Sequence, residues 1–263
     1  MKRAIGLIVM AAFLLCGIVA GAMFYRQYSD AKRSSDTFSE LQELVKQPEE
    51  TSASTKTEET TGDTSEGVEG PQEPIIFDKY RPLFEQNNDL VGWIRIDGTG
   101  IDYPVMQTPG NPDYYLKHSF EKTWSDYGVP YVDGSCTVGV SNNLIIYGHN
   151  MKNGTMFHDL VNYTKKEFYE AHPVICFDTV DAPGQYQVIA VFRYNTNKEI
   201  FVYKEHTDMD ESEFAEYVEN CRARSIYDTG ITAEFGDQLI TLSTCEYTYT
   251  NGRFVVVAKK IVE

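Results

Sequence analysis

Three residues of this 263-residue chain carry side chains that together could catalyse acyl transfer. Cys245 ends an apolar run that begins at Gln238, and Arg253 follows eight residues later. A thiolate is a strong nucleophile, and a nearby arginine stabilises both the thiolate and a developing oxyanion. His149 ends another apolar run directly after a glycine, and histidine is the usual proton carrier for a sulfur nucleophile. The pattern predicts a Cys–His pair with an assisting cation.

Strand alternation predicts that two of these side chains, Cys245 and Arg253, meet at one rim. Period-2 alternation gives Ser243 and Cys245 the same face of the run 238–245, and Arg253 lies at the start of the run 252–262. If the two runs pair antiparallel, Cys245 and Arg253 lie close together. The alternative interpretation of the same pattern is structural. Cys245 would simply end a barrel strand, and Arg253 would be a solvated charge at the rim of the barrel.

Composition excludes several classes of protein. The net charge of -16 argues against nucleic-acid binding, because the phosphate backbone would be repelled. The five cysteines show no CxxC or Cys/His spacing, and no EF-hand loop is visible, so we expect neither a metal nor a cofactor. Two disulfides are arithmetically possible, but isolated cysteines are more often small buried hydrophobes.

The N-terminus predicts a membrane anchor. Ala4–Phe24 carries no charge, and a helix of that length spans roughly 30 Å, enough to cross a bilayer. We expect an uncleaved single-pass anchor and juxtamembrane segment over residues 1–33, with the rest of the chain outside the cell. A cleaved signal peptide is the alternative, because Ala20–Ala22 has small residues at the spacing of a cleavage site.

Residues 34–74 are rich in Thr, Ser, Glu and Gly, and they predict a disordered acidic tether. A flexible chain of this length would have a reach of roughly 35 Å. Its first part also contains apolar positions compatible with a short helix: Phe38, Leu41, Leu44 and Val45. The folded domain is expected over residues 75–263.

Within that domain, many short strands and scattered helices favour a closed or nearly closed β-barrel over a βαβ sheet. A helix is expected near residues 76–84, and two short helices over Met156–Tyr163 and Lys165–Ala171. The clearest helix is Asp208–Arg222, which begins with a capping-box spacing. The predicted strands are Val91–Ile96, Ile101–Met106, Val129–Val132, Asn143–Tyr147, Val174–Phe177, Gln185–Tyr194, Gln238–Cys245 and Gly252–Val262.

The chain resembles a known family. Leu242-Ser243-Thr244-Cys245 with Arg253, preceded by Tyr147-Gly148-His149-Asn150-Met151, is similar to the motifs of the sortases, the cysteine transpeptidases of Gram-positive cell surfaces. The resemblance extends over roughly residues 75–262. A helix before the barrel and a helix in the connection before the penultimate strand resemble class B. The resemblance implies a sortase-like closed β-barrel of about eight strands with these two helices.

The resemblance also implies roles. Cys245 would attack the carbonyl after the threonine of a sorting signal and hold the cleaved protein as a thioacyl intermediate. His149 would act as general acid and then as general base, and Arg253 would hold substrate and stabilise the oxyanion. Four further positions match residues that line the class B site, Leu116 more loosely than the rest: Leu116, Tyr147, Ser243 and Glu246.

The function implied is cleavage of surface proteins at a threonine-containing signal and transfer to the amine of lipid II or peptidoglycan. The enzyme is expected to act as a monomer on the cell membrane, without a cofactor. A pilin polymerase, whose acceptor is a lysine of another pilin, and a catalytically silent tethered binding module are the alternatives. A papain-like protease is disfavoured because His149 precedes Cys245.

Overall fold

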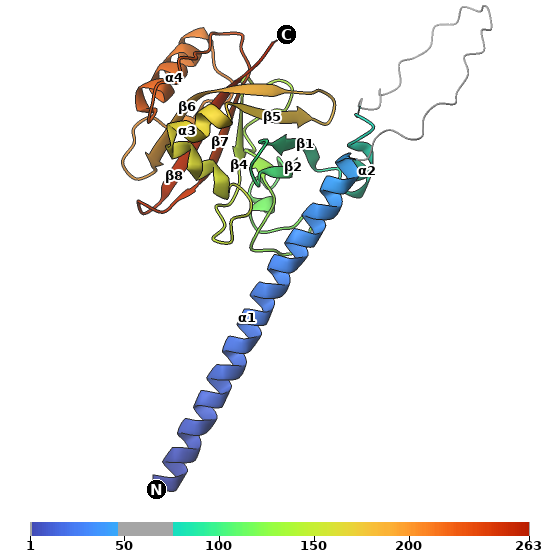
Figure 1. Ribbon diagram of the computed structural model, residues 1–263, viewed down its shortest axis with the longest axis vertical. Helices are drawn as coiled ribbons and strands as arrows, with labels where there is room; N and C mark the ends of the chain where they lie inside the picture. The colour runs from blue at the N-terminus through green and yellow to red at the C-terminus, as the bar shows by residue number, and fades with distance from the viewer. Residues whose placement is uncertain (1, 47–75, 263) are drawn as a thin grey trace, which may run out of the picture.

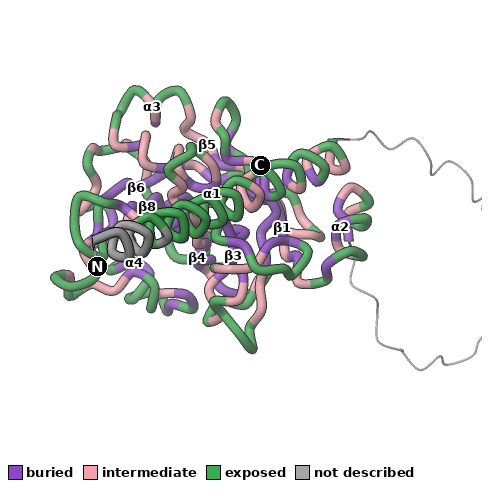
Figure 2. The backbone as a smooth tube through the Cα atoms, turned by 90° about the horizontal axis from the view of Figure 1, so that it is seen from below, coloured by how far each residue is buried: buried purple, intermediate pink, exposed green. Residues whose placement is uncertain are grey.

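The computed structural model describes residues 2–46 and 76–262, and within the first helix it places the side chains of residue 10 and residues 12–46. In these residues, eight strands close into a barrel, and a long N-terminal helix leads away from it (Figure 1). The buried residues form one core that follows the strands (Figure 2). The predicted closed barrel of eight strands is confirmed.

Barrel closure brings distant parts of the chain together. The strand order is β1-β2-β3-β4-β7-β8-β6-β5, and β5 pairs with β1. Two neighbouring pairs, β2 with β3 and β4 with β7, run parallel, whereas the other pairs are antiparallel. All predicted strands are confirmed to within two residues of their ends: β1 Leu90–Arg95, β2 Asp102–Met106, β3 Tyr131–Val132, β4 Asn143–Tyr147, β5 Val174–Thr179, β6 Gln185–Asn195, β7 Leu239–Glu246 and β8 Gly252–Lys260.

Both helices that the resemblance implied are present. The short α2 (Arg81–Gln86) precedes the barrel, and α4 (Glu211–Arg224) lies in the connection between β6 and β7. Asp210 caps α4 by accepting from the amide of Glu213, whose side chain accepts in turn from the amide of Asp210. Besides the long N-terminal helix, α2 and α4, the described residues form one short α-helix and three 3-10 turns: η1 Tyr114–Leu116, η2 His158–Thr164, α3 Lys166–Ala171 and η3 Tyr203–Glu205.

The first helix, α1 (Lys2–Lys46), corrects the predicted tether. Residues 34–46 are helical and packed on the domain, so the prediction of disorder is wrong for this part. Phe38 and Leu41 are buried, and the ring of Phe38 meets Tyr103 of β2 edge-on with centroids 5.0 Å apart. Burial of these apolar side chains stabilises the helix, as tertiary packing does for most helices in proteins. The rest of the predicted tether, residues 47–74, lies outside the described residues.

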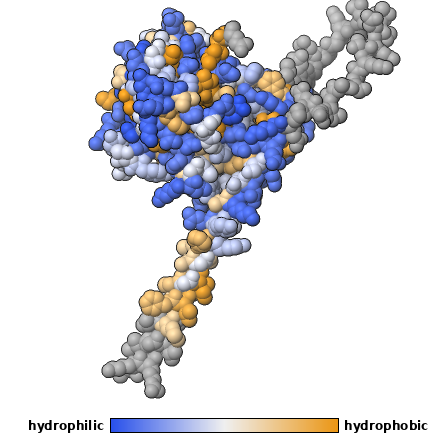
Figure 3. Space-filling model, viewed as in Figure 1, coloured by the Kyte–Doolittle hydropathy of each residue, from blue (hydrophilic) through white to orange (hydrophobic). Residues whose placement is uncertain are grey.

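The N-terminal half of α1 projects away from the barrel (Figure 1). Its large apolar side chains are exposed, among them Phe13, Ile18 and Phe24, and they colour this part of the surface hydrophobic in Figure 3. Judged over the described residues alone, none of the helices has both the length and the apolar character needed to cross a membrane.

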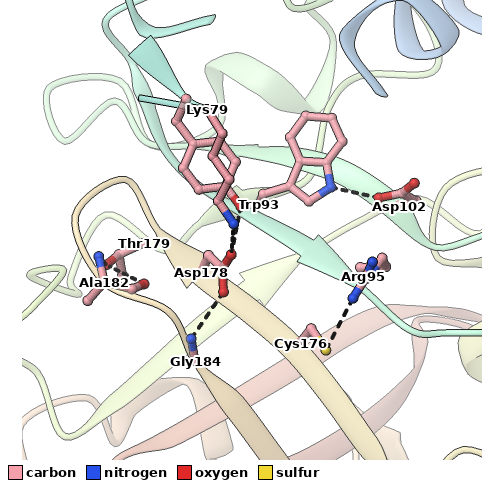
Figure 4. A network of polar contacts seen from close by, with 10 residues as sticks. Lys79, Trp93, Arg95, Asp102, Cys176, Asp178, Thr179, Ala182 and Gly184 are labelled. Carbon is pink, nitrogen blue, oxygen red and sulfur yellow. Dashed lines mark hydrogen bonds and ion pairs between the residues drawn. The ribbon is translucent and has the colours of Figure 1, made fainter. Parts of the chain in front are cut away.

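A polar network joins the segment before α2 to β5 (Figure 4). Asp178 of β5 accepts hydrogen bonds from Lys79 at 2.7 Å and from the hydroxyl of Tyr80 at 2.8 Å. Nearby, the guanidinium of Arg95 in β1 lies 4.0 Å from the sulfur of Cys176 in β5. These residues line a cavity of about 380 Å³.

Candidate active site

The pairing of β7 with β8 places Cys245 next to Arg253. The two residues are directly opposite in the antiparallel register, one pair from the end at which the strands are joined. Residues directly opposite in such a pair have Cβ atoms roughly 4.5–5.5 Å apart, which is within reach of an arginine side chain. The predicted neighbourhood of these two residues is confirmed.

The parallel pairing of β4 with β7 brings the histidine to the same rim. Tyr147 lies opposite Ser243, and both strands run in the same direction. His149 is two residues beyond Tyr147, and Cys245 is two residues beyond Ser243. The ends of the two strands therefore carry the imidazole and the thiol to one end of the barrel.

Hydrogen bonds fasten the two strand ends together. The hydroxyl of Thr244 donates to the carbonyl of Gly148 at 2.7 Å, and the amide side chain of Asn150 donates to the carbonyl of Cys245 at 3.0 Å. Gly148 is required at its position, because a Cβ there would lie 2.5 Å from the ring of Phe157. Hydrogen bonds with the residues that follow β4 thus hold the backbone around the candidate nucleophile in place.

A groove of about 590 Å³ opens at this rim. Its walls come from the strands β3, β4, β6, β7 and β8, from η1 and from the connection that contains η3. Six of the seven predicted site residues line it: Leu116, Tyr147, His149, Ser243, Cys245 and Arg253.

His149 is anchored by the backbone of η1. Its Nε2 lies 2.8 Å from the carbonyl oxygen of Leu116. Burial lowers the pKa of His149 below its usual 6.5, and the Leu116 carbonyl offsets part of this effect by favouring the charged ring. An imidazole of this kind can give and take a proton near neutral pH, as acyl transfer requires.

Two predicted substrate-binding residues are held by neighbours inside the groove. Ser243 is almost fully buried, and its hydroxyl lies 2.8 Å from that of Tyr203. The hydroxyl of Tyr147 donates to Asp133 at 2.8 Å. Burial raises the pKa of Tyr147 and raises that of Tyr203 to about 12, so both phenols stay neutral.

The structure does not bring Glu246 into the groove. Its carboxylate bonds with the amide and hydroxyl of Thr248, and the guanidinium of Arg193 lies 3.5 Å away. Glu246 follows Cys245 in the same strand, so alternation turns its side chain to the opposite face. Its carboxylate orders the β7–β8 connection instead.

Several groove residues were not predicted from sequence. Asp133 follows the end of β3, and a search for acids directly after strand ends could have found it. Tyr131 donates to Asp113 at 3.3 Å in the same wall. Tyr203 lies in η3, where no hydrophobic period marks it.

The other thiols of the barrel differ from Cys245. Cys136 and Cys221 are buried, and burial raises the pKa of each to about 12. A neutral buried thiol is inert, since the thiolate is the reactive form. Cys176 and Cys245 are partly exposed, and only Cys245 lies in the groove with His149.

Comparison with known proteins gives the family. Residues 94–261 match the sortase domain. Sortase B of Listeria monocytogenes is 35% identical over 191 residues, 72% of this chain and 76% of its own. Sortase B of Staphylococcus aureus is 35% identical over 189 residues, 69% of this chain and 75% of its own. A solved structure of a Staphylococcus aureus sortase B–substrate complex covers 89% of this chain and 98% of its own, with 27% identity and a TM-score of 0.71.

The motifs, the eight-stranded barrel and these relatives agree with one another. The chain belongs to the sortase family and is a class B sortase, a cysteine transpeptidase.

Proposed function

We propose that this sortase cleaves surface proteins within a threonine-containing sorting signal and transfers the acyl group to a cell-wall amine. The observation that carries the proposal is the convergence of His149, Cys245 and Arg253 on one groove at the ends of three neighbouring strands. The related Staphylococcus aureus sortase B was solved as a substrate complex, which supports a peptide substrate. The groove volume is in the range of pockets that bind small ligands or short peptide segments.

In the first step, the Cys245 thiolate attacks the carbonyl carbon of the threonine in the signal. The C–S bond forms and the C–N bond breaks, while the imidazolium of His149 gives its proton to the leaving amine. Arg253 donates hydrogen bonds to the oxyanion of the tetrahedral intermediate. The product is a thioester between Cys245 and the surface protein.

In the second step, a lipid II or peptidoglycan amine attacks the thioester. His149 accepts the proton of the incoming amine, the C–N bond forms, and the thiolate of Cys245 leaves. The general acid of one step is thus the general base of the next, as covalent catalysis through a thioester requires.

For location, we propose that Ala4–Phe24 anchors the chain in the cell membrane, with the barrel outside. The exposed apolar side chains of the projecting half of α1 support this. Because α1 continues without a break into its docked part, the barrel would stand close to the membrane. From Phe24 to Asp30, the first residue bonded to the barrel, the helix rises only about 9 Å.

A cleavage screen tests the proposal. The purified full-length chain in detergent is incubated with a library of threonine-containing pentapeptides, and products are identified by mass spectrometry. A triglycine amine and a lysine-bearing peptide are supplied together. We expect cleavage after the threonine and transfer to triglycine. Transfer to lysine alone would favour a pilin polymerase, and absence of cleavage in every peptide would favour a silent binding module.

A further inference from the structure

The bond between His149 and Leu116 determines which nitrogen of the ring carries the proton. The Leu116 carbonyl oxygen can only accept, so the Nε2 atom at 2.8 Å must donate. A neutral imidazole has a single N–H. Nδ1 is then the unprotonated nitrogen of the resting neutral ring.

The carbonyl itself is held by close backbone packing. The amide of Leu116 donates to Asp113 at 3.1 Å, and on either side the carbonyls of Tyr115 and Lys117 accept from amides further along the loop. Gly128 lies directly against this turn with a φ of +60°, and a Cβ added there would clash with the carbonyl oxygen of Tyr115 and lie 2.9 Å from the Leu116 oxygen. A side chain at residue 128 would therefore push the carbonyl away from its place.

The N-terminal helix braces the same loop. Asp30 of α1 accepts from the amide of Asp126 at 2.9 Å, and Asp126 pairs with Lys117 at 3.0 Å. A second link runs from Thr37 of α1 to Glu121 at 2.6 Å. The segment from η1 to Gly128 thus has one side on the active site and the other on α1.

We propose that the main-chain carbonyl of Leu116 is the positioning group for His149, fixing the Nε2–H tautomer, and that Gly128 keeps this carbonyl in place. Other Cys–His pairs use a side chain of a third residue to orient the base. Here a backbone atom on a braced loop has that role. The inference rests on the proposed function, because it assigns the proton transfers of both steps to Nδ1.

The proton balance follows from this tautomer. In the first step Nδ1–H of the imidazolium gives its proton to the leaving amine while Nε2–H stays bonded to Leu116. In the second step the Nδ1 lone pair takes the proton of the incoming amine. The charged and titratable groups around the ring are Lys117 and Asp126 on the loop and, lining the same groove, Cys245 of β7 and Arg253 of β8.

Nitrogen NMR of the full-length chain in detergent micelles tests the tautomer directly. The chain is labelled with ¹⁵N-histidine, and the His149 signals are assigned by their loss in His149→Gln. We expect a pyrrole-type signal for Nε2 and a pyridine-type signal for Nδ1 at a pH where the ring is neutral. A proton on Nδ1, or averaged signals as in free imidazole, would overturn the proposal.

Gly128→Ala tests the role of the carbonyl. We expect loss of the single tautomer, a lower midpoint of the ring titration because a pKa-raising bond is lost, and a fall in kcat of about 10- to 100-fold with KM within about twofold. Gly230→Ala is the matched control, since Gly230 has a φ of +74° but nothing within 4 Å of an added Cβ. Unchanged ring signals and kcat in Gly128→Ala would contradict the proposal.

The two proposals fail separately. The wild-type spectrum needs no substrate, so it gives an answer even if Gly128→Ala does not fold. A fixed Nε2–H tautomer in a chain that cleaves no peptide would contradict the proposed function alone. Cleavage by a chain whose His149 carries its proton on Nδ1 would contradict this inference alone.

Discussion

The barrel contains two cysteine–arginine pairs with the same cross-strand geometry. Cys245 lies opposite Arg253 in the antiparallel pair β7–β8, and Cys176 lies opposite Arg95 in the antiparallel pair β1–β5. In each pair the cysteine is partly exposed and faces a cavity. A thiol directly opposite an arginine in an antiparallel strand pair therefore does not by itself mark an active site.

The surroundings of the two pairs differ. Around Cys245 the groove adds His149 from the parallel neighbour β4 and neutral hydroxyls from Tyr147, Tyr203 and Ser243. Around Cys176 the cavity is lined with charged groups already engaged in ion pairs, such as Lys79 with Asp178 at 2.7 Å (Figure 4). A proton carrier in the same groove makes the first pair a candidate catalyst, whereas the second pair is part of a structural network.

The largest expected difference between the two pairs concerns the thiols. We expect Cys245→Ala to lower the rate of peptide cleavage by a factor on the order of 10⁴ or more, since the nucleophile is lost. Cys176→Ala should leave the rate within about twofold. Initial rates with the best peptide of the library screen measure both. Comparable losses of cleavage rate in the two variants would show that the two cysteines do not differ in catalytic role.

The second-largest difference should be between the two arginines, in the effect of their substitution on kcat. Lysine keeps the charge of arginine but not its planar fork of donors. Arg253→Lys should therefore reduce kcat by about 10²- to 10³-fold, the usual effect of losing an oxyanion donor. Arg95→Lys is the matched variant on the other side of the barrel, and its kcat should be unchanged. Wild-type kcat in Arg253→Lys would show that the guanidinium does not contact the oxyanion.

For stability, in contrast to activity, we expect a large effect in the network around Cys176. Asp178→Ala removes the acceptor of Lys79 and of the Tyr80 hydroxyl, which is nearly fully buried. We expect the free energy of unfolding to fall by about 1–3 kcal/mol, the cost of leaving such donors unsatisfied. Urea titration followed by fluorescence measures it, with kcat expected to stay at the wild-type value. A large loss of activity in folded protein would mean that this side also serves catalysis.

The smallest effect concerns the protonation of His149. Burial lowers its pKa below 6.5, Lys117 lowers it further, and Asp126 raises it. The imidazolium fraction therefore falls as pH rises through a value below 6.5. Lys117→Met should move the titration midpoint upward and Asp126→Asn downward, as followed by NMR in the Cys245→Ala background. Shifts of the opposite sign would mean that the loop charges do not face the ring.

Much of the fold could be predicted because local pattern and global structure agree. Strands that are buried on both faces are continuous apolar runs in the sequence. The spacing of Asp210 and Glu213 predicted the start of α4. The pair of Cys245 and Arg253 was predictable because a single short connection sets the register of β7 and β8. His149 stands out at the end of an apolar run, but its place beside Cys245 needed the family resemblance, since a parallel pairing such as β4 with β7 leaves no local signal.

The errors have physical reasons. Composition predicts disorder for residues 34–46, but Phe38 and Leu41, whose spacing is compatible with a short helix, supply a buried stripe that outweighs the polar composition. Glu246 was assigned to the site by its motif position, although alternation puts it on the face away from Cys245. Tyr203 and Asp133 are brought to the groove by tertiary packing of turns, which no hydrophobic periodicity in the sequence indicates.

The most direct test of Cys245 as the nucleophile is to locate the thioacyl intermediate. The wild-type chain is mixed with the best signal peptide in the absence of an amine, quenched in acid and digested, and the modified cysteine is identified by mass spectrometry. We expect the acyl fragment ending in threonine to be attached to Cys245 and Cys176 to be unmodified. An adduct on Cys176, or cleavage by Cys245→Ala at the wild-type rate, would contradict it.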